Sequence, residues 1–259
     1  NLKGLEESIA TSKKDKIILL FNFPNNPTGY TALEKEQNAI RDMIIKYADK
    51  GKKIIAVCDD AYYGLFYNKD IYPGSIFSKL AGIHKNVISV KVDGVSKEDY
   101  AWGFRIGVIT FADYYKDSEV YSAIEQKTIA CIRSSVSSYS RSAQSIFVNT
   151  INDEHTEKEK AEKFNILRKR EDKVREEVFR EEYKDLWDVY PFNSGYFMCL
   201  RITGVSAEDV RQHALLNHGL GTIALGTDLR VAFSCIEEKN IESVFKIIAQ
   251  SINEVKSGK

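Results

Sequence analysis

Short, continuous apolar runs separated by helical patterns constrain the fold of this chain more than any other feature. Such runs occupy residues 16–23, 53–58, 87–92 and 105–111. Between the first two, residues 32–50 carry apolar side chains at helical spacing, and Gly51 is a suitable C-terminal stop. Strands without polar alternation are typical of a mostly parallel sheet with helices on both faces. We therefore predict an α/β fold.

The pattern changes in the second half of the chain. It is helical from about residue 112 to 183, and strand patterns then return at 195–202, 222–225 and 229–235, with helical patterns at 207–217 and 239–255. We predict a larger domain over residues 1–160 and a smaller α+β domain over residues 161–259. The boundary falls in a stretch of mixed charge, 154–184, which predicts a long solvated helix.

Composition excludes several classes of partner. The 37 basic and 37 acidic residues give zero net charge, which argues against a nucleic-acid binder. No apolar run is long enough to cross a membrane, and the first residues lack a signal-peptide core. The four cysteines form no C-x-x-C pair, and three lie in apolar runs, so we expect buried free thiols, no metal site and a cytoplasmic protein.

Two polar signals follow predicted strands in the first half. The stretch F-N-F-P-N-N-P-T-G, residues 21–29, is a turn by composition, but it also places Asn26 at a strand end where ligands bind. The stretch V-C-D-D-A-Y-Y-G-L, residues 57–65, places Asp59 and Tyr62 at another strand end. The alternative for this second signal is a helix N-cap formed by Asp59 or Asp60.

Two further signals carry cations. In D-G-V-S-K-E-D-Y-A-W-G-F-R-I-G, residues 93–107, Lys97 follows a strand and could form an imine with an aldehyde cofactor. Arg105 suits a phosphate group. In D-L-R-V-A-F-S, residues 228–234, Arg230 would be costly to bury without a carboxylate partner. The simpler interpretation of each cation is a solvated surface side chain.

The four signals in this order resemble the class I and II aminotransferases, pyridoxal-5'-phosphate (PLP) enzymes of fold type I in the aspartate aminotransferase superfamily. The resemblance covers almost the whole chain. It rests on the N-P-T-G turn, the Asp-x-x-Tyr spacing, the eight residues from lysine to arginine, and N-S-G-Y-F at residues 193–197. It implies that the chain contains part of the family's large PLP-binding domain and its small C-terminal domain.

The resemblance implies roles for the cofactor-binding residues. Asn26 and Tyr62 match the residues that bond the phenolic oxygen of PLP, and Asp59 matches the aspartate that pairs with the pyridine nitrogen. Lys97 matches the lysine that binds the cofactor covalently and later moves the substrate proton.

A further match concerns the phosphate group of PLP, because Arg105 corresponds to the arginine that binds it. Gly94 departs from the serine that is common in the phosphate cup, and Ser96 could compensate for that lost hydroxyl.

The resemblance also implies the substrates, an amino acid and a 2-oxo acid. Arg230 matches the arginine that grips the substrate α-carboxylate. Arg133, in C-I-R-S-S-V-S-S at residues 131–138, falls where dicarboxylate-specific members bind the side chain, so aspartate or glutamate is the expected donor. Its alternative is a cation at a helix C-terminus. A homodimer is expected for the full-length protein.

The family's N-terminal arm, phosphate loop and ring-stacking aromatic residue should precede residue 1, so roughly 150 residues of a complete enzyme are expected upstream. We therefore expect this chain alone to bind PLP poorly and to lack activity. The alternatives are a β-eliminating PLP lyase on the same fold, a non-catalytic PLP-sensing domain of a transcription regulator, and the remnant of a split gene.

Overall fold

The computed structural model describes residues 1–258, which form two compact units. The N-terminal unit comprises Asn1–Phe23, Ala32–Gly64 and Lys69–Thr156. The C-terminal unit begins again at Glu157, and it also includes the short segments Pro24–Thr31 and Leu65–Asn68. Sequence patterns placed a domain boundary near residue 160, but they did not indicate that these two early segments group with the later one.

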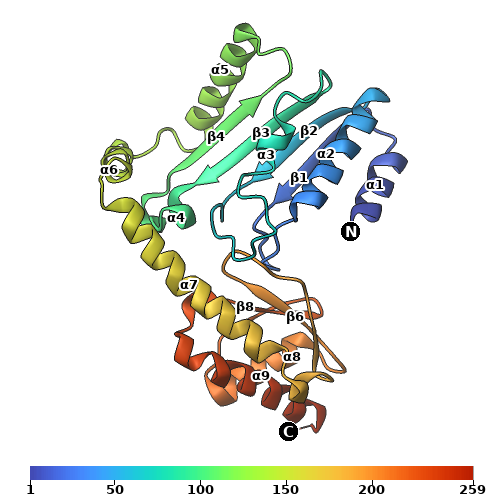
Figure 1. Cartoon of the computed structure of the whole chain (residues 1–259), viewed down its shortest axis with the longest axis vertical. Helices are drawn as coiled ribbons and strands as arrows, with labels where there is room; N and C mark the ends of the chain where they lie inside the picture. The colour runs from blue at the N-terminus through green and yellow to red at the C-terminus, as the bar shows by residue number, and fades with distance from the viewer. Residues whose placement is uncertain (259) are drawn as a thin grey trace. The chain divides into compact units, whose positions relative to one another are not determined.

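The N-terminal unit is built on a four-stranded sheet in the order β1-β2-β3-β4 (Figure 1). Its elements are α1 (Leu2–Thr11), β1 (Lys16–Asn22), α2 (Glu34–Asp49), β2 (Lys53–Asp59), α3 (Phe77–Leu80), β3 (Val87–Gly94), α4 (Val95–Glu98), a 3₁₀ turn (Trp102–Phe104), β4 (Gly107–Ala112), α5 (Ser118–Ser135) and α6 (Arg141–Ile151). Strands β1, β2 and β3 are parallel, and β4 is antiparallel to β3. The predicted, mostly parallel α/β sheet is confirmed.

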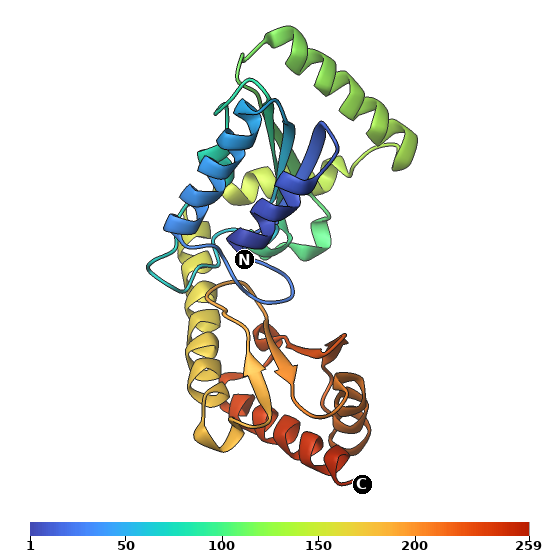
Figure 2. The ribbon, with the colours of Figure 1, turned by 90° about the vertical axis from the view of Figure 1, so that its right-hand side faces the viewer.

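Helices α1, α2 and α3 cover one face of this sheet (Figures 1 and 2). Ile9 of α1, Ile44 of α2 and Leu80 of α3 are fully buried in one apolar cluster with alternate residues of the strands. Because successive strand side chains point to opposite faces, only half of each apolar run is used in this cluster.

The opposite face of the sheet carries the other half of each run. The register pairs Ile18 with Ile55 and Ile55 with Ile88, and it pairs Leu20 with Val57, so these side chains share that face. Ile18 is 65% exposed and Leu20 is 67% exposed. Within residues 1–258, helices therefore cover only one face of this sheet, whereas helices on both faces were predicted.

The C-terminal unit contains an antiparallel sheet in the order β5-β6-β8-β7. Its elements are α7 (Thr156–Val178), β5 (Trp187–Val189), β6 (Met198–Ile202), α8 (Ala207–His218), β7 (Ile223–Leu225), β8 (Asp228–Val231), α9 (Ile241–Lys256), and 3₁₀ turns at Glu181–Tyr183, Phe233–Cys235 and Glu238–Asn240. Side chains from α7, α8, α9 and the sheet form one buried cluster around Phe233 and Phe245. The predicted smaller α+β region is thus present.

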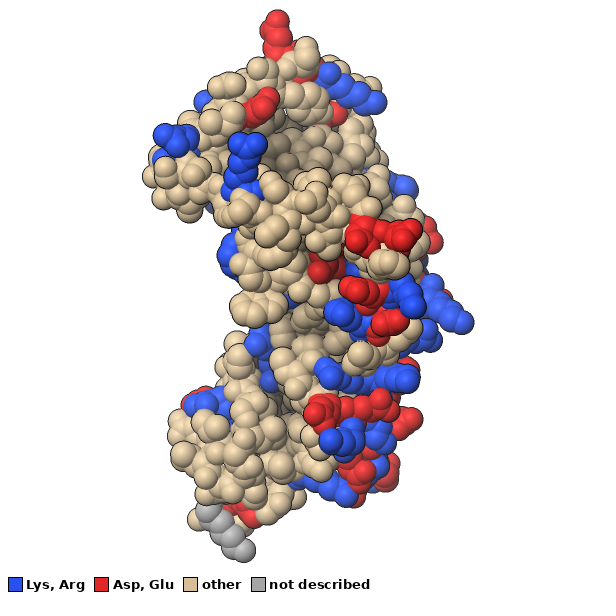
Figure 3. All heavy atoms as spheres, turned by 90° about the vertical axis from the view of Figure 1, so that its left-hand side faces the viewer, with Lys and Arg blue, Asp and Glu red and all other residues tan. Residues whose placement is uncertain are grey.

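The predicted long, charged helix is α7, which is mostly exposed but buries one side. Val174 and Val178 lie in the core cluster. Glu171 and Glu177 are also buried, and each is paired with a cation: Glu171 with Arg175, and Glu177 with Lys173 at 2.8 Å. The exposed residues of the helix keep the mixed charge, and Figure 3 shows acidic and basic side chains interspersed on one face of the molecule.

Two local predictions also need correction. The strand expected from residue 105 begins at Gly107, and the strand expected to reach Cys235 ends at Val231. Cys235 lies in a 3₁₀ turn and is exposed, whereas Cys58 and Cys199 are buried, and burial raises the pKa of both buried thiols to about 12. Within residues 1–258, no helix combines the length and the apolar character that a membrane span requires.

Candidate active site

The carboxyl end of β2 presents Asp59 and Tyr62 of the N-terminal unit. The Asp59 carboxylate accepts a hydrogen bond of 3.2 Å from the backbone N–H of Ala61, and Tyr62 is buried. Residues 61–64 form a turn and not a helix, so the helix N-cap interpretation of this segment is wrong. The Asp59 side chain instead fixes the start of a tight turn, as aspartates commonly do.

Lys97 follows the end of the neighbouring strand, β3, on the short helix α4. Gly94 precedes this helix in an extended conformation and pairs with Gly107 of β4. The Lys97 Nζ atom lies 5.9 Å from the centre of the Tyr62 ring. The structure therefore brings together two of the predicted residues, one from each of two adjacent strand ends. Ser96 is half-buried on the same helical turn.

Arg105 and Arg133 are exposed in the N-terminal unit. Arg105 has a left-handed backbone conformation, with φ of 55°, and its Nη1 donates to the carbonyl of Trp102 at 3.1 Å. Arg133 lies in the last turn of α5 and donates to the carbonyl of Ser137 at 3.2 Å. The contact of Arg133 is the one expected of a helix C-terminal cation.

Sequence reasoning missed a charged cluster beside this site. Lys91 of β3 lies 3.4 Å from the buried Asp60 carboxylate, contacts Asp93, and stands over the Tyr63 ring at 5.0 Å. Burial raises the pKa of Asp60 to about 6, although Ser75 and Lys91 lower it. A lysine inside the apolar run V-I-S-V-K-V was the available signal, because a buried cation requires a partner.

In the C-terminal unit, the N-P-T-G turn is closed by Asn25. The Asn25 side chain accepts hydrogen bonds from the backbone N–H of Thr28 at 3.1 Å and from the Thr28 hydroxyl at 2.7 Å. Its backbone carbonyl accepts from Gly29 N–H at 2.8 Å. Since Asn25 supplies these bonds, the neighbouring Asn26 side chain is available to point outward, and Asn26 is exposed.

The N-P-T-G and N-S-G-Y-F segments form one substructure. The Gly29 carbonyl accepts hydrogen bonds from the backbone N–H groups of Asn193 and Ser194, both at 2.9 Å. The Asn193 amide bonds both backbone groups of Thr31, at 2.8 and 2.9 Å. Gly29 has φ of +73°, and a Cβ there would lie 1.9 Å from the Phe197 carbonyl oxygen, so only glycine fits.

This substructure holds Asn26 against Arg230 of β8. Arg230 Nη1 donates to the Asn26 side-chain oxygen at 2.8 Å, and the guanidinium lies 4.2 Å from the centre of the Phe197 ring. Arg230 Nε is buried and has no hydrogen-bond partner among the described residues. Arg230 also lines a cavity of about 400 Å³, together with the Thr222 hydroxyl and apolar side chains. A carboxylate would satisfy the remaining guanidinium donors.

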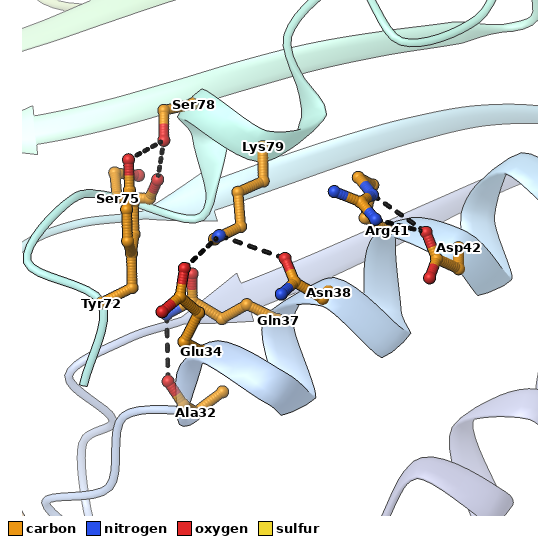
Figure 4. A network of polar contacts seen from close by, with 10 residues as sticks. All are labelled: Ala32, Glu34, Gln37, Asn38, Arg41, Asp42, Tyr72, Ser75, Ser78 and Lys79. Carbon is orange, nitrogen blue, oxygen red and sulfur yellow. Dashed lines mark hydrogen bonds and ion pairs between the residues drawn. The ribbon is translucent and has the colours of Figure 1, made fainter. Parts of the chain in front are cut away.

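A separate depression of about 620 Å³ lies at the start of α2 in the N-terminal unit. Figure 4 shows its polar network, in which the Lys79 amine bonds Glu34 at 3.2 Å and Asn38 at 3.1 Å. The same amine stands 4.1 Å from the centre of the Tyr72 ring. Lys79 thus has partners on several sides within the protein, and the network serves to attach the loop before α3 to α2.

The sequence profile of the family described as aminotransferase class I and II matches residues 1–248. The chain belongs to this family. The protein is 33% identical over 100 residues to an asparagine–oxo-acid transaminase of Streptococcus mutans, and that match covers 38% of this chain and 23% of the transaminase. The predicted family is therefore confirmed.

Solved aminotransferase structures share the fold. An aminotransferase from Anaerococcus prevotii matches with a TM-score of 0.84 and 25% identity, over 98% of this chain and 61% of the other. LysN, an α-aminoadipate aminotransferase from Thermus thermophilus, matches with a TM-score of 0.77 and 18% identity, over 100% and 64% of the two chains. The chain thus spans less than two thirds of the length of these relatives.

The residues at the two strand ends suit PLP. A carboxylate can hold a protonated ring nitrogen, a phenol can bond the ring oxygen, and an amine can bind an aldehyde. Asp59, Tyr62 and Lys97 provide these three groups within the N-terminal unit. In the C-terminal unit, the buried Nε of Arg230 has no hydrogen-bond partner among the described residues, which leaves one donor for an anion. The donor set of the chain therefore fits the family's cofactor.

Proposed function

We propose that this chain belongs to a PLP-dependent aminotransferase that moves an amino group between an amino acid and a 2-oxo acid. The chain belongs to a family of aminotransferases, and one observation supports the proposal most directly. Arg230 donates to Asn26, while its buried Nε has no partner among the described residues. A buried donor without a partner is costly, an anion would complete the coordination of this guanidinium, and every substrate of an aminotransferase has a carboxylate.

In the N-terminal unit, the proposed roles follow from charge and reach. When bound, PLP supplies an aldehyde carbon for the amino group and a ring that accepts electrons. The Asp59 carboxylate holds the proton of the ring nitrogen, and the Tyr62 hydroxyl bonds the ring oxygen. With PLP bound, the Lys97 amine would accept the proton from the substrate Cα and would donate it to the C4' carbon of the cofactor. Ser96 and Arg105 bind the phosphate.

In the C-terminal unit, Arg230 grips the α-carboxylate through two parallel hydrogen bonds, and Asn26 orients the guanidinium for this contact. The Phe197 ring beneath the guanidinium restricts it to one plane. A carboxylate fixed in this way presents Cα in one orientation, which is the main contribution that positioning can make to proton transfer.

The amino donor follows less directly from the residues. The contact between Arg133 and the Ser137 carbonyl favours a structural role for Arg133 over recognition of an acidic side chain. The named relative acts on asparagine. We propose a four-carbon or five-carbon amino acid with a polar side chain as donor, and a panel of aspartate, glutamate and asparagine distinguishes them. A homodimer remains the proposed assembly of the full-length protein.

Borohydride trapping tests the proposal. The chain and the complete product of its gene are incubated with PLP, reduced, digested and analysed by mass spectrometry. We expect a phosphopyridoxyl adduct on Lys97, and we expect Lys97→Ala to abolish it while the exposed Lys85→Ala leaves it unchanged. An adduct spread over many lysines, or none in the complete protein, would contradict the assignment.

The products distinguish the reaction classes. Incubation of the complete protein with an amino acid should yield pyridoxamine phosphate, because transamination leaves the amino group on the cofactor. Release of ammonia together with a 2-oxo acid would instead indicate β-elimination. Trapping at Lys97 without either product would indicate a PLP-sensing domain.

A further inference from the structure

Two histidines and a glutamate that have no role in the proposed function converge in the C-terminal unit. His213 and His218 belong to α8, and Glu254 belongs to α9. The Nε2 atoms of His213 and His218 lie 3.4 Å and 3.3 Å from the same carboxylate oxygen, Oε2 of Glu254. The three candidate ligand atoms all lie within 4.8 Å of one another.

The two nitrogen–oxygen separations match the edges of a metal coordination tetrahedron, and the two imidazole nitrogens lie within 4.8 Å of each other. Zinc binds imidazole nitrogen at about 2.0–2.1 Å and carboxylate oxygen at about 2.0–2.2 Å, so adjacent ligand atoms of a tetrahedral site lie about 3.4 Å apart. The two measured nitrogen–oxygen separations already have this length. Little movement is needed for an ion to sit between the three atoms.

The surroundings prepare the carboxylate for such an ion. Gln250, one turn before Glu254 on α9, donates to its other oxygen, Oε1, at 2.8 Å, which leaves Oε2 facing the imidazoles. A hydrogen-bonded carboxylate of fixed orientation is the usual arrangement at metal sites.

The cluster is also accessible. The side chains of His213, His218 and Glu254 are 11%, 20% and 30% exposed. An ion can therefore enter from solvent, and water can complete the coordination. Calcium and magnesium prefer sites built from oxygen alone, whereas two imidazoles and one carboxylate suit zinc and its neighbours in the first transition row.

We propose that His213, His218 and Glu254 bind a divalent transition-metal ion such as zinc, with a fourth position open to solvent. The ion would link the C-terminal ends of α8 and α9. The site is independent of the proposed aminotransferase activity, because none of its ligands belongs to the PLP or substrate residues.

Zinc titration of the tag-free chain tests this inference. Cys131 and Cys235 are exposed thiols that could bind zinc themselves, so the titration uses the Cys131→Ser/Cys235→Ser background. We expect one equivalent to bind, in competition with a chromogenic chelator. Saturating zinc should raise the unfolding temperature by roughly 5 °C or more, because the ion binds the folded state.

The variants separate coordination from a simple hydrogen-bonded contact between helices. Glu254→Gln keeps hydrogen-bonding capacity but removes a good metal ligand, and we expect it to weaken zinc binding by roughly tenfold or more. His218→Gln gives a second variant if the first does not fold. The exposed His155 side chain pairs with Glu154 and belongs to no cluster of candidate ligands, so His155→Ala should bind zinc like the parent.

Cobalt gives an independent readout, since a four-coordinate ion with two imidazoles has characteristic visible absorption bands that should vanish in Glu254→Gln. The inference would be overturned if the parent and Glu254→Gln bound zinc equally, or if the parent bound none at micromolar concentrations.

Discussion

Folding raises the pKa of Asp60, a buried carboxyl group of the N-terminal unit. Its carboxyl is almost fully buried, and desolvation raises its pKa from an ordinary 3.8 to about 6 despite the nearby Lys91 amine. The folded protein therefore holds this proton more tightly than the unfolded chain does. The contribution of Asp60 to stability is greatest below about pH 4 and decreases as the pH rises to about 6, above which it is constant.

Asp60→Asn removes this effect. We expect the difference in unfolding free energy, variant minus wild type, to increase by up to about 3 kcal/mol between pH 4 and pH 7, because that is the free energy of a shift of about two pKa units. Urea denaturation at several pH values measures it. The exposed Asp42→Asn is the control, with a flat difference expected. A flat difference for Asp60→Asn would show that Lys91 fully compensates the buried charge.

Two segments far apart in the sequence, residues 24–31 and 193–197, act as one element. Asn193 is buried and supplies both hydrogen bonds to the backbone of Thr31, which is itself 2% exposed. The Asn193 side chain therefore makes two of the bonds that attach the loop that carries Asn26.

Asn193→Ala should destabilise the C-terminal unit by roughly 2–4 kcal/mol, because it leaves a buried N–H and a buried carbonyl without partners. Chemical denaturation followed by tryptophan fluorescence measures this, since Trp187 lies in the core of the unit. The exposed Asn217→Ala should change stability by less than about 0.5 kcal/mol. Equal effects of the two substitutions would contradict the role given to Asn193.

Much at this scale was predictable from the sequence. The run 53–58 became β2 at Lys53–Asp59, and the helical pattern at 207–217 became α8 at Ala207–His218. Apolar periodicity is local, and it determines such elements well. The turn motifs were also visible in the sequence. Their residues predict a turn but do not indicate which distant segment the turn contacts, so the contact between Gly29 and Asn193 could not be inferred.

The histidine cluster was hidden for a related reason. His213 and His218 are five residues apart, which separates them by about 140° around a regular helix. They approach only because His218 is the last residue of α8, where Gly219 ends the helix, and because α9 brings Glu254 to them.

The roles at a PLP site stay predictions for Asn26, Asp59, Tyr62, Ser96, Lys97, Arg105 and Arg230.

At the scale of the whole molecule, the exposed apolar sheet face has a direct consequence. Ile18 of β1, Ile55 of β2 and Ile88 of β3 form one row on this face, and Leu20 and Val57 lie in the next row. No charged side chain stands among these residues. Exposed apolar patches of this kind promote association. We expect the chain to self-associate as its concentration rises.

Ile18→Thr/Leu20→Thr should reduce this association, because threonine keeps the preference for strands while removing apolar surface. Size-exclusion chromatography with light scattering at two concentrations measures the mass. Leu216 of α8 is 78% exposed in the other unit, so Leu216→Thr is the control and should leave the mass unchanged. A monomer at all concentrations, or equal effects of the two variants, would contradict the expectation.

The attachment of Thr31 to Asn193 and Ser194 determines when the N-P-T-G turn can dock during synthesis of the chain. The partners of Thr31 are synthesised 162 and 163 residues after it. At about 5–20 residues per second, a nascent chain waits roughly 10–30 s before its N-P-T-G turn can dock. Until Asn193 and Ser194 have left the ribosome, the segment that presents Asn26 lacks these partners. Its contact with Arg230 forms later still, because Arg230 follows both residues in the sequence.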